Sequence, residues 1–364
     1  MTTRREFNRL ATISSIGLMI HPGLGTMYPG SEKIKIGQIG TGHSHAEKKY
    51  TTIQRFNKHF EVVGLVENDP QSLKIARNKI EFQDARWMTE EQLFNTSGLM
   101  AVLVETDFND LLPTAIRCIE NGFHVHIDKP PGDSLEGLKS LLQKAAAKNL
   151  VVQMGYMFRY HPAFQFCFNA VREGLVGEVF EVHGVISKKI KAERRKRLAN
   201  TYGGGMMLLG CHLIDILVAL SGRPQSISRF GKQSNPDQDN LFDNELAVFE
   251  YPRLTATITS TLLEVDGMNR RQFIVCGSNG TIQIQPLEPA VLRLTLEEDS
   301  QKYKKGMQQI NLSELTGRYD DQMIDFARQV KGETTPLFST THDLDVHESL
   351  LKASGIIPLK KEVE

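Results

Sequence analysis

The sequence lacks the features that would place it in several functional classes. Its 43 basic and 43 acidic residues cancel, so no overall field attracts nucleic acid or an anionic membrane, and no nucleic-acid partner is expected. Cys118, Cys167, Cys211 and Cys276 are scattered without a CxxC pair, which argues against a zinc ribbon or a thioredoxin-like centre. We expect these thiols to be free and buried.

The first thirty residues have the pattern of a targeting segment. Thr3-Arg4-Arg5-Glu6-Phe7 resembles a twin-arginine export signal, and residues 11–20 add a short apolar stretch. That stretch is shorter than the about 20 apolar residues that span a bilayer. We therefore expect residues 1–30 to be a signal and linker, and a periplasmic protein that is free or attached to the membrane, without an integral membrane segment. If these residues are only a frayed basic terminus, the protein is cytoplasmic.

Short apolar runs alternate with amphipathic stretches between residues 31 and 150. Strands are expected at 33–39, 61–66, 100–104 and 124–127, and helices at 45–56, 70–79, 112–121 and 135–148. The run 100–104 is almost wholly apolar, which is typical of a strand buried on both faces. The alternation predicts an α/β fold, with a doubly wound parallel sheet in an N-terminal Rossmann domain.

The pattern changes after residue 150. Strands are predicted at 178–187, 246–251, 255–263, 272–276 and 281–285, and helices at 162–173, 206–220 and 320–331. Strands that follow one another without crossover helices indicate a mostly antiparallel sheet. Residues 151–336 are therefore expected to form an α+β domain with a large open-faced sheet. In residues 337–364, a helix at 342–354 is expected to pack back near the domain junction.

A glycine-rich turn follows the first predicted strand, with the sequence Gly40-Thr41-Gly42-His43-Ser44-His45. Two glycines let the backbone approach a pyrophosphate, whose charge rests on the following helix N-terminus. His45 replaces the third glycine of the usual pattern. Glu67, after the second strand, can accept hydrogen bonds from the adenosine ribose hydroxyls and would repel a 2′-phosphate, so NAD is expected rather than NADP. The alternative is a turn of this shape that binds no nucleotide.

Asp128-Lys129-Pro130 follows the strand predicted at 124–127, at the sheet edge where open α/β sheets bind ligands. Lys129 could lie near the nicotinamide and donate a hydrogen bond to a substrate hydroxyl or carbonyl. A surface lysine before a proline turn is the common alternative.

A third group of residues lies in the second half of the chain. Glycines 203–205 suit close approach of backbone to a ligand, and His212 and Asp215 lie one helical turn apart. A histidine with a carboxylate at that spacing could be a general base with its orienting partner. A helix histidine can also be purely structural.

Two further patterns remain open. His43/His45 and His124/His126 are each two residues apart, but no third ligand with plausible spacing accompanies them, so no metal site is expected. The basic run 188–197 is either a solvated face or a contact for an anionic substrate or a cofactor phosphate.

Together and in this order, these motifs resemble the Gfo/Idh/MocA oxidoreductase family, which includes glucose–fructose oxidoreductase and inositol dehydrogenase. The resemblance covers residues 33–354. It implies hydride transfer between a sugar or polyol and NAD(P), with Lys129 and His212 near the reacting hydroxyl. It also implies a homo-oligomer formed through the open sheet. The residues expected to line the substrate pocket with His212 are Tyr156, Arg159, His161 and Tyr202.

The sequence departs from the family pattern at several places. Leu208 stands four residues before His212, where the family usually has an aspartate, and Asp128 replaces a glutamate in the Lys-Pro motif. Thr106-Asp107-Phe108 replaces a Thr-Pro-Asn turn, and the family's nearby histidine is missing. Thr106 and Asp128 remain candidate cofactor contacts. Besides a sugar dehydrogenase, two alternatives stay open: a glycoside hydrolase or lyase that recycles NAD through transient oxidation, and a non-catalytic NAD- or sugar-binding protein.

Overall fold

The computed structural model describes residues 33–199 and 203–358. The twin-arginine motif and Tyr202 lie outside these residues. Among the described helices, none is long and apolar enough to cross a membrane.

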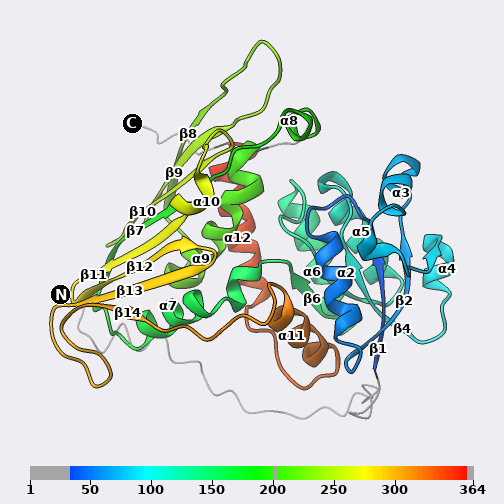
Figure 1. The fold of residues 1–364 in the computed structure, drawn as a ribbon, viewed down its shortest axis with the longest axis horizontal. Helices are drawn as coiled ribbons and strands as arrows, with labels where there is room; N and C mark the ends of the chain where they lie inside the picture. The colour runs from blue at the N-terminus through cyan, green and yellow to red at the C-terminus, as the bar shows by residue number, and fades with distance from the viewer. Residues whose placement is uncertain (1–32, 200–202, 359–364) are drawn as a thin grey trace. The chain divides into compact units, whose positions relative to one another are not determined.

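The first domain is built on a six-stranded parallel sheet, in the strand order β3-β2-β1-β4-β5-β6 (Figure 1). Its strands are β1 Ile34–Ile39, β2 Phe60–Val66, β3 Trp87–Met88, β4 Leu99–Val104, β5 His124–Ile127 and β6 Val152–Met154. Nearly every residue of β4 is buried, as its apolar run predicts. The doubly wound parallel sheet expected from the sequence is present.

The sheet ends beyond residue 150, where the sequence pattern placed the domain boundary. β6 pairs in parallel with β5 through Val152 and Met154 and completes the sheet. A strand of three residues is too short to show a hydrophobic period, which is why the pattern did not reveal it.

Helices connect the strands of this domain. They are α2 Ala46–Arg55, α3 Pro70–Ala76, α4 Glu90–Phe94, α5 Leu111–Glu120 and α6 Leu135–Ala147, with short 3₁₀ turns at Ile80–Phe82 and Phe108–Asp110. Asp69 caps α3 by accepting from Ser72 N at 2.6 Å, and Pro70 occupies its first turn. By contrast, no side chain caps the N-terminus of α2.

The second domain contains an eight-stranded sheet in the order β14-β13-β12-β11-β7-β10-β9-β8, in which only β7 and β10 pair in parallel. Its strands are β7 Val179–Val185, β8 Ser226–Lys232, β9 Asn244–Glu250, β10 Thr255–Thr261, β11 Gln272–Gly277, β12 Gly280–Leu287, β13 Ala290–Leu296 and β14 Gly306–Ile310. This is the mostly antiparallel sheet that the strand pattern predicts.

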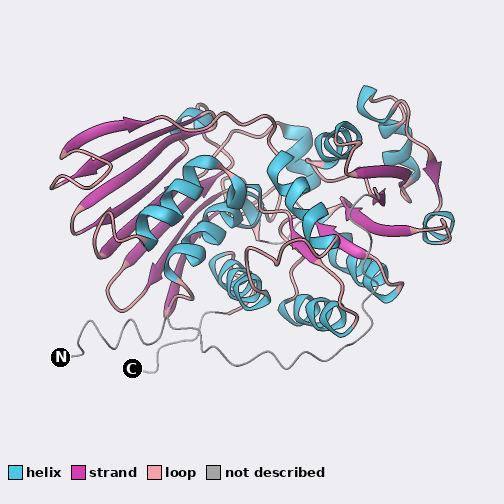
Figure 2. Ribbon diagram, turned by 90° about the horizontal axis from the view of Figure 1, so that it is seen from below, coloured by secondary structure: helices cyan, strands magenta, loops and turns pink. Residues whose placement is uncertain are grey.

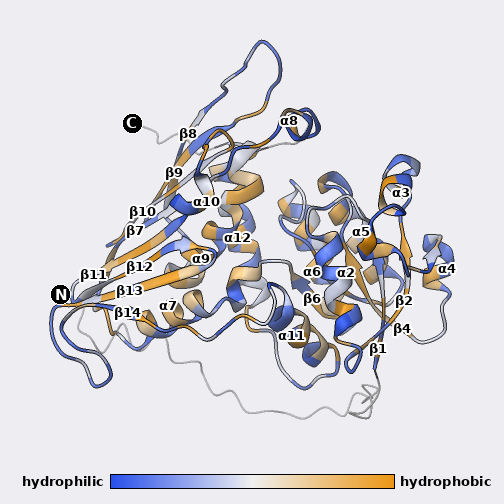
Figure 3. Cartoon of the chain, in the orientation of Figure 1, coloured by the Kyte–Doolittle hydropathy of each residue, from blue (hydrophilic) through white to orange (hydrophobic). Residues whose placement is uncertain are grey.

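Helices lie along one face of this sheet, as the two views in Figures 1 and 2 show. The helices of this part of the chain are α7 Pro162–Arg172, α8 Ala192–Leu198, α9 Cys211–Ser221, α10 Gly267–Arg270, α11 Asp320–Val330 and α12 Thr340–Ala353, with a 3₁₀ turn at Met157–Tyr160. Residues alternate between buried and half-exposed along β9 and β10, as in strands with one covered face, and β10 contacts α9. Figure 3 shows the hydrophobic residues of β12 and β13 on this sheet.

The two C-terminal helices join the domains. α12 packs against α6 of the first domain and α9 of the second, as expected for a helix at the junction. α11 contacts α2, and Asp320 at its start pairs with Arg55 at the end of α2.

One predicted helix is interrupted. The sequence pattern predicts a single helix over 206–220, but Met206–Gly210 forms a π-helical turn before α9 begins. Such turns are common at functional sites.

Candidate active site

The glycine-rich turn lies between β1 and α2 and packs against the end of β4. Gly40 has a φ of +96°, and a Cβ there would overlap the main chain of Thr106. Only glycine combines a positive φ with the absence of a Cβ, so position 40 requires it. Thr41 donates to Glu67 Oε2 from its backbone nitrogen at 2.8 Å and from its hydroxyl at 2.6 Å, which joins the turn to the end of β2.

Several features of this turn fit a dinucleotide. The uncapped N-terminus of α2 leaves backbone N–H groups for a phosphate. Thr41, Gly42, His43, Ser44 and His45 line the adjoining cleft. Close by, the buried Thr106 hydroxyl has no hydrogen-bond partner in the described structure. Glu67 keeps lone pairs free beyond those that Thr41 and Asp69 use, so its carboxylate can still accept from a ribose.

A buried polar cluster lies where β1, β4 and β5 end. Nδ1 of His43 and Nδ1 of His45 lie 2.9 and 3.1 Å from Asp128 Oδ2. The fully buried Lys49 ammonium lies 2.7 Å from the same oxygen and 2.9 Å from Glu105 Oε1. Adjacent parallel strands bring their carboxyl ends together, so residues far apart in the sequence meet here.

The cluster shifts the pKa values of its members in different directions. Burial lowers the pKa of His43, and that of His45 to about 3, although Asp128 opposes both shifts. For Lys49 burial is outweighed by Asp128 and Glu105, so its pKa is raised. Burial and the nearby Asp128 hold the pKa of Glu105 well above its usual range. Both imidazoles are therefore neutral near pH 7.

Lys49 and Glu105 did not emerge from the motifs, although each leaves a signal. Lys49 falls on the same helical face as Ala46 and Ile53, both buried, so a lysine occupies an apolar face. Glu105 directly follows the apolar strand β4. A charged residue in either of these apolar contexts indicates that it is buried with a partner of opposite charge.

The sequence predicted no metal site because a third ligand was missing, and the structure brings a third candidate ligand close to His43 and His45. Asp128 joins His43 and His45 in a group whose ligand atoms all lie within 4.8 Å of one another. Sequence spacing could not reveal it, because the two segments meet only through the sheet. His124 and His126 do not form such a group: His124 Nδ1 accepts from Val151 N, and His126 faces Lys49 and Gln153.

Lys129 extends from the end of β5 to the second domain. Its Nζ donates to the main-chain oxygen of Leu208 at 3.0 Å, within the π-helical turn. The position where the family usually carries an aspartate therefore offers Lys129 a carbonyl oxygen instead of a carboxylate. Lys129 and His212 both line the large cleft.

His212 does not have the partner that the sequence spacing suggested. Its Nδ1 is buried without a hydrogen-bond partner in the described structure, and burial and Lys129 hold its pKa well below the usual range. Asp215 instead accepts from Arg159 at 2.6 to 3.1 Å and lies 3.2 Å from His342 Nε2. Residues three apart share a helix face, but a buried guanidinium attracts the carboxylate more strongly than a neutral imidazole does.

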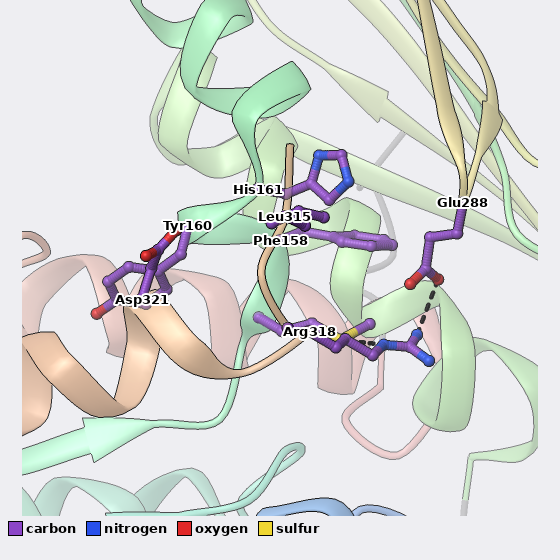
Figure 4. Close-up of a pocket in the computed structure, with 9 residues that line it drawn as sticks. Phe158, Tyr160, His161, Glu288, Leu315, Arg318 and Asp321 are labelled. Carbon is purple, nitrogen blue, oxygen red and sulfur yellow. Dashed lines mark hydrogen bonds and ion pairs between the residues drawn. The ribbon is translucent and has the colours of Figure 1, made fainter. Parts of the chain in front are cut away.

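Three residues expected to bind substrate lie away from the large cleft. Arg159 is buried between Asp215 and Asp343, 2.6 Å from each, so its charge is already neutralised. Tyr156 is buried beneath His212, with ring centres 6.4 Å apart. His161 caps α7 and lines a different cavity, shown in Figure 4 beside Arg318 and Glu288. That cavity, of about 10 Å³, has room for about one water molecule.

The glycines at 203–205 approach protein rather than the cleft. A Cβ on Gly204 would overlap the carbonyl oxygen of Phe242, and Gly204 has a φ of +57°. The next turn is held by Glu245, whose Oε2 accepts from Met206 N at 2.7 Å. The close contact with the Phe242 backbone therefore explains why position 204 is glycine, without a bound ligand.

The large cleft, of about 1030 Å³, lies between the glycine turn and the second domain. Basic side chains dominate its charged lining, and four of them, Lys188, Lys191, Arg194 and Arg197, come from the basic run. Burial and the nearby Arg194 and Lys129 lower the pKa of Lys188 to about 7. Part of the basic run therefore faces the cleft, where it could contact an anionic substrate or a cofactor phosphate. Arg195, in the same run, instead pairs with Asp239 and Asp243.

Two models of one protein family match the chain. The model described as the oxidoreductase family with an NAD-binding Rossmann fold matches residues 34–156, and the GFO/IDH/MocA C-terminal domain matches residues 164–283. Together they cover about two thirds of the chain, one on each domain.

Individual relatives agree with this assignment. The uncharacterised oxidoreductase YdgJ of Escherichia coli K12 is 26% identical over 276 residues, which cover 72% of this chain and 75% of YdgJ. Inositol 2-dehydrogenase of Rubrobacter xylanophilus is 28% identical over 154 residues, 40% of this chain and 42% of that enzyme. The aldose-aldose oxidoreductase of Caulobacter crescentus, solved with glycerol, superposes with a TM-score of 0.74 at 18% identity, covering 89% of this chain and 98% of that one. The last match shows a shared fold.

Proposed function

Because the chain belongs to the Gfo/Idh/MocA oxidoreductase family, we propose that it transfers a hydride between a sugar or polyol carbinol carbon and NAD. The observation that carries this proposal is the position of Lys129. It follows β5, lines the same cleft as the glycine turn and reaches the second domain at Leu208. A cleft at the carboxyl ends of the strands, between two domains, is the usual ligand site of such a sheet.

The chain's own residues have distinct roles in this proposal. Nicotinamide chemistry supplies the hydride acceptor, and the glycine turn with Glu67 holds the dinucleotide. Lys129 donates to the substrate oxygen and stabilises its developing negative charge. His212, which lines the same cleft, would take the hydroxyl proton.

We also propose NAD rather than NADP as the cofactor. Glu67 lies at the end of β2, next to the turn, where it would face the adenosine ribose. Its carboxylate is compatible with two ribose hydroxyls but repels a 2′-phosphate. If the twin-arginine motif directs export, NAD would leave the cytoplasm already bound, because that route transports folded proteins.

Sugar turnover with NADH detection tests this function. We expect sugars or polyols added with NAD to give their oxidised products and equal amounts of NADH. Release of an aglycone from a glycoside without net NADH would instead identify the NAD-recycling hydrolase or lyase. Binding of NAD without turnover across a broad sugar panel would identify a non-catalytic binding protein, an alternative that Leu208 supports because the usual carboxylate is absent.

A further inference from the structure

The cluster at the ends of β1, β4 and β5 contains a ligand set that the roles given to Lys129 and His212 do not use. His43 Nδ1, His45 Nδ1 and Asp128 Oδ2 converge, with the two nitrogens 2.9 and 3.1 Å from the oxygen. In a tetrahedral zinc centre with bonds of about 2.0–2.1 Å, ligand atoms lie about 3.3 Å apart. The two nitrogen–oxygen distances are close to that value, and all three atoms lie within 4.8 Å of one another.

A second observation concerns Glu105, which lies beside these three atoms. Glu105 is fully buried, and its Oε2 has no hydrogen-bond partner in the described structure. That oxygen lies 3.6 Å from His43 Nδ1, so it faces the same ligand set. Its other oxygen is satisfied by Lys49. A buried carboxylate oxygen without a donor is costly, and a cation or a proton beside it would remove that cost.

We propose that His43, His45 and Asp128 bind a divalent transition-metal ion, with Glu105 beside them. Two imidazoles and a carboxylate are the ligand types that zinc and similar ions prefer. Lys49 already pairs with both carboxylates of the cluster, so the ion would bind beside its ammonium.

The surroundings of Asp128 resemble the outer shell of a metal ligand. Its Oδ1 accepts from Lys129 N at 2.6 Å, and its Oδ2 accepts from Lys49 Nζ at 2.7 Å. Hydrogen bonds of this kind fix the direction of a ligating carboxylate. Gly155 also packs closely on Asp128, which limits its movement.

The proposed ion would be accessible from the cleft. His43 and His45 line it together with Lys129 and His212, and the rings of His45 and His212 are centred 6.4 Å apart. Three protein ligands leave one coordination position for water or substrate, which distinguishes catalytic zinc sites from structural ones.

The catalytic role of this ion rests on the function proposed above. Bound to the substrate hydroxyl, the ion would lower the pKa of that hydroxyl, so its proton leaves through His212 or water. The C–H bond would then break, and its electron pair would move with the hydrogen to a bound nicotinamide. The carbinol carbon would be oxidised, NAD⁺ would be reduced, and the ion would keep its charge.

Metal analysis of the full chain tests the site directly. The protein is produced without a polyhistidine tag, purified without chelators and measured by inductively coupled plasma mass spectrometry. We expect about one divalent transition-metal ion per chain. The His43→Gln and His45→Gln variants should lose it. His183→Gln is the matched control, because His183 pairs with Thr257 on β10, far along the chain from the cluster, and should retain the ion.

A second measurement separates metal loss from misfolding. Chelator-treated protein is titrated with ZnCl₂ while its melting temperature is followed. Wild type and His183→Gln should be stabilised, whereas His45→Gln should melt like chelated wild type and need more than about 100-fold more zinc.

Two results would overturn the site: native protein that lacks stoichiometric metal and is not stabilised by ZnCl₂, or His43→Gln and His45→Gln variants that bind zinc as tightly as wild type. In the first case a proton on Glu105, whose pKa is raised by burial and by Asp128, takes the place of the ion. Bound NAD is measured in the same samples. NAD without metal contradicts only this inference, whereas metal without NAD contradicts the proposed function and leaves the site intact.

Discussion

Replacing Lys129 with methionine is expected to lower kcat by about 10²–10⁴-fold while NAD remains bound. The Lys129 ammonium lies in the cleft, and the structure gives it one protein acceptor, the Leu208 carbonyl at 3.0 Å, so it can also donate to a substrate oxygen. Methionine has similar length and fits the same space without the charge. Steady-state NADH formation measures the loss, and mass spectrometry of the denatured protein measures retained NAD.

Lys139→Met provides the matched control, because Lys139 is exposed on α6. It should leave turnover and NAD content unchanged. If Lys129→Met turns over at close to the wild-type rate, Lys129 has no role in the chemistry and only joins the two domains.

Replacing Asp215 with alanine is expected to lower the free energy of unfolding by about 3–5 kcal/mol. Asp215 is fully buried and pairs with Arg159, which lies equally close to Asp343. Removing one carboxylate leaves a buried guanidinium with half of its compensation. Urea denaturation followed by circular dichroism measures the change, and the fraction that stays folded should keep its NAD.

Asp299→Ala removes an exposed carboxylate that pairs with Lys304, and it should leave the melting temperature unchanged. A loss of turnover without a loss of stability in Asp215→Ala would support the role that the sequence spacing suggested, in which Asp215 orients His212.

Strands with a strong apolar pattern were predictable from the sequence, and several others were not. β4 is buried on both faces and has a continuous apolar run, while β9 and β10 alternate because one face is covered. β8, with its serines and glycine, carries little hydrophobic signal. β13 does alternate through Leu292, Leu294 and Leu296, so its pattern could have identified it.

The candidate site was predictable where its chemistry is local. The glycine turn, Glu67 and Lys129 are set by motifs within a few residues, and the structure places the turn and Lys129 at one cleft. The partners of Asp215 and Asp128 come from segments far apart in the sequence. The spacing of His212 and Asp215 on one helix could not reveal that Arg159 binds Asp215. The spacing of His43 and His45 could not reveal that Asp128, after β5, lies beside them.

Leu208 lies where Lys129 reaches the second domain. The side chain there is apolar, yet its carbonyl still accepts from Lys129 through the π-helical turn. His43 and His45 of the His–His–Asp group line the same cleft as Leu208. We therefore expect the chemistry of this chain to depend on the cluster around Asp128 as well as on Lys129.

Mass spectrometry of the denatured, freshly purified native protein tests the central claim most directly. The account predicts NAD, rather than NADP, in an amount approaching one per chain. A protein that contains no dinucleotide, and whose melting temperature does not respond to added NAD or NADH, would contradict the claim that this chain is a nicotinamide oxidoreductase.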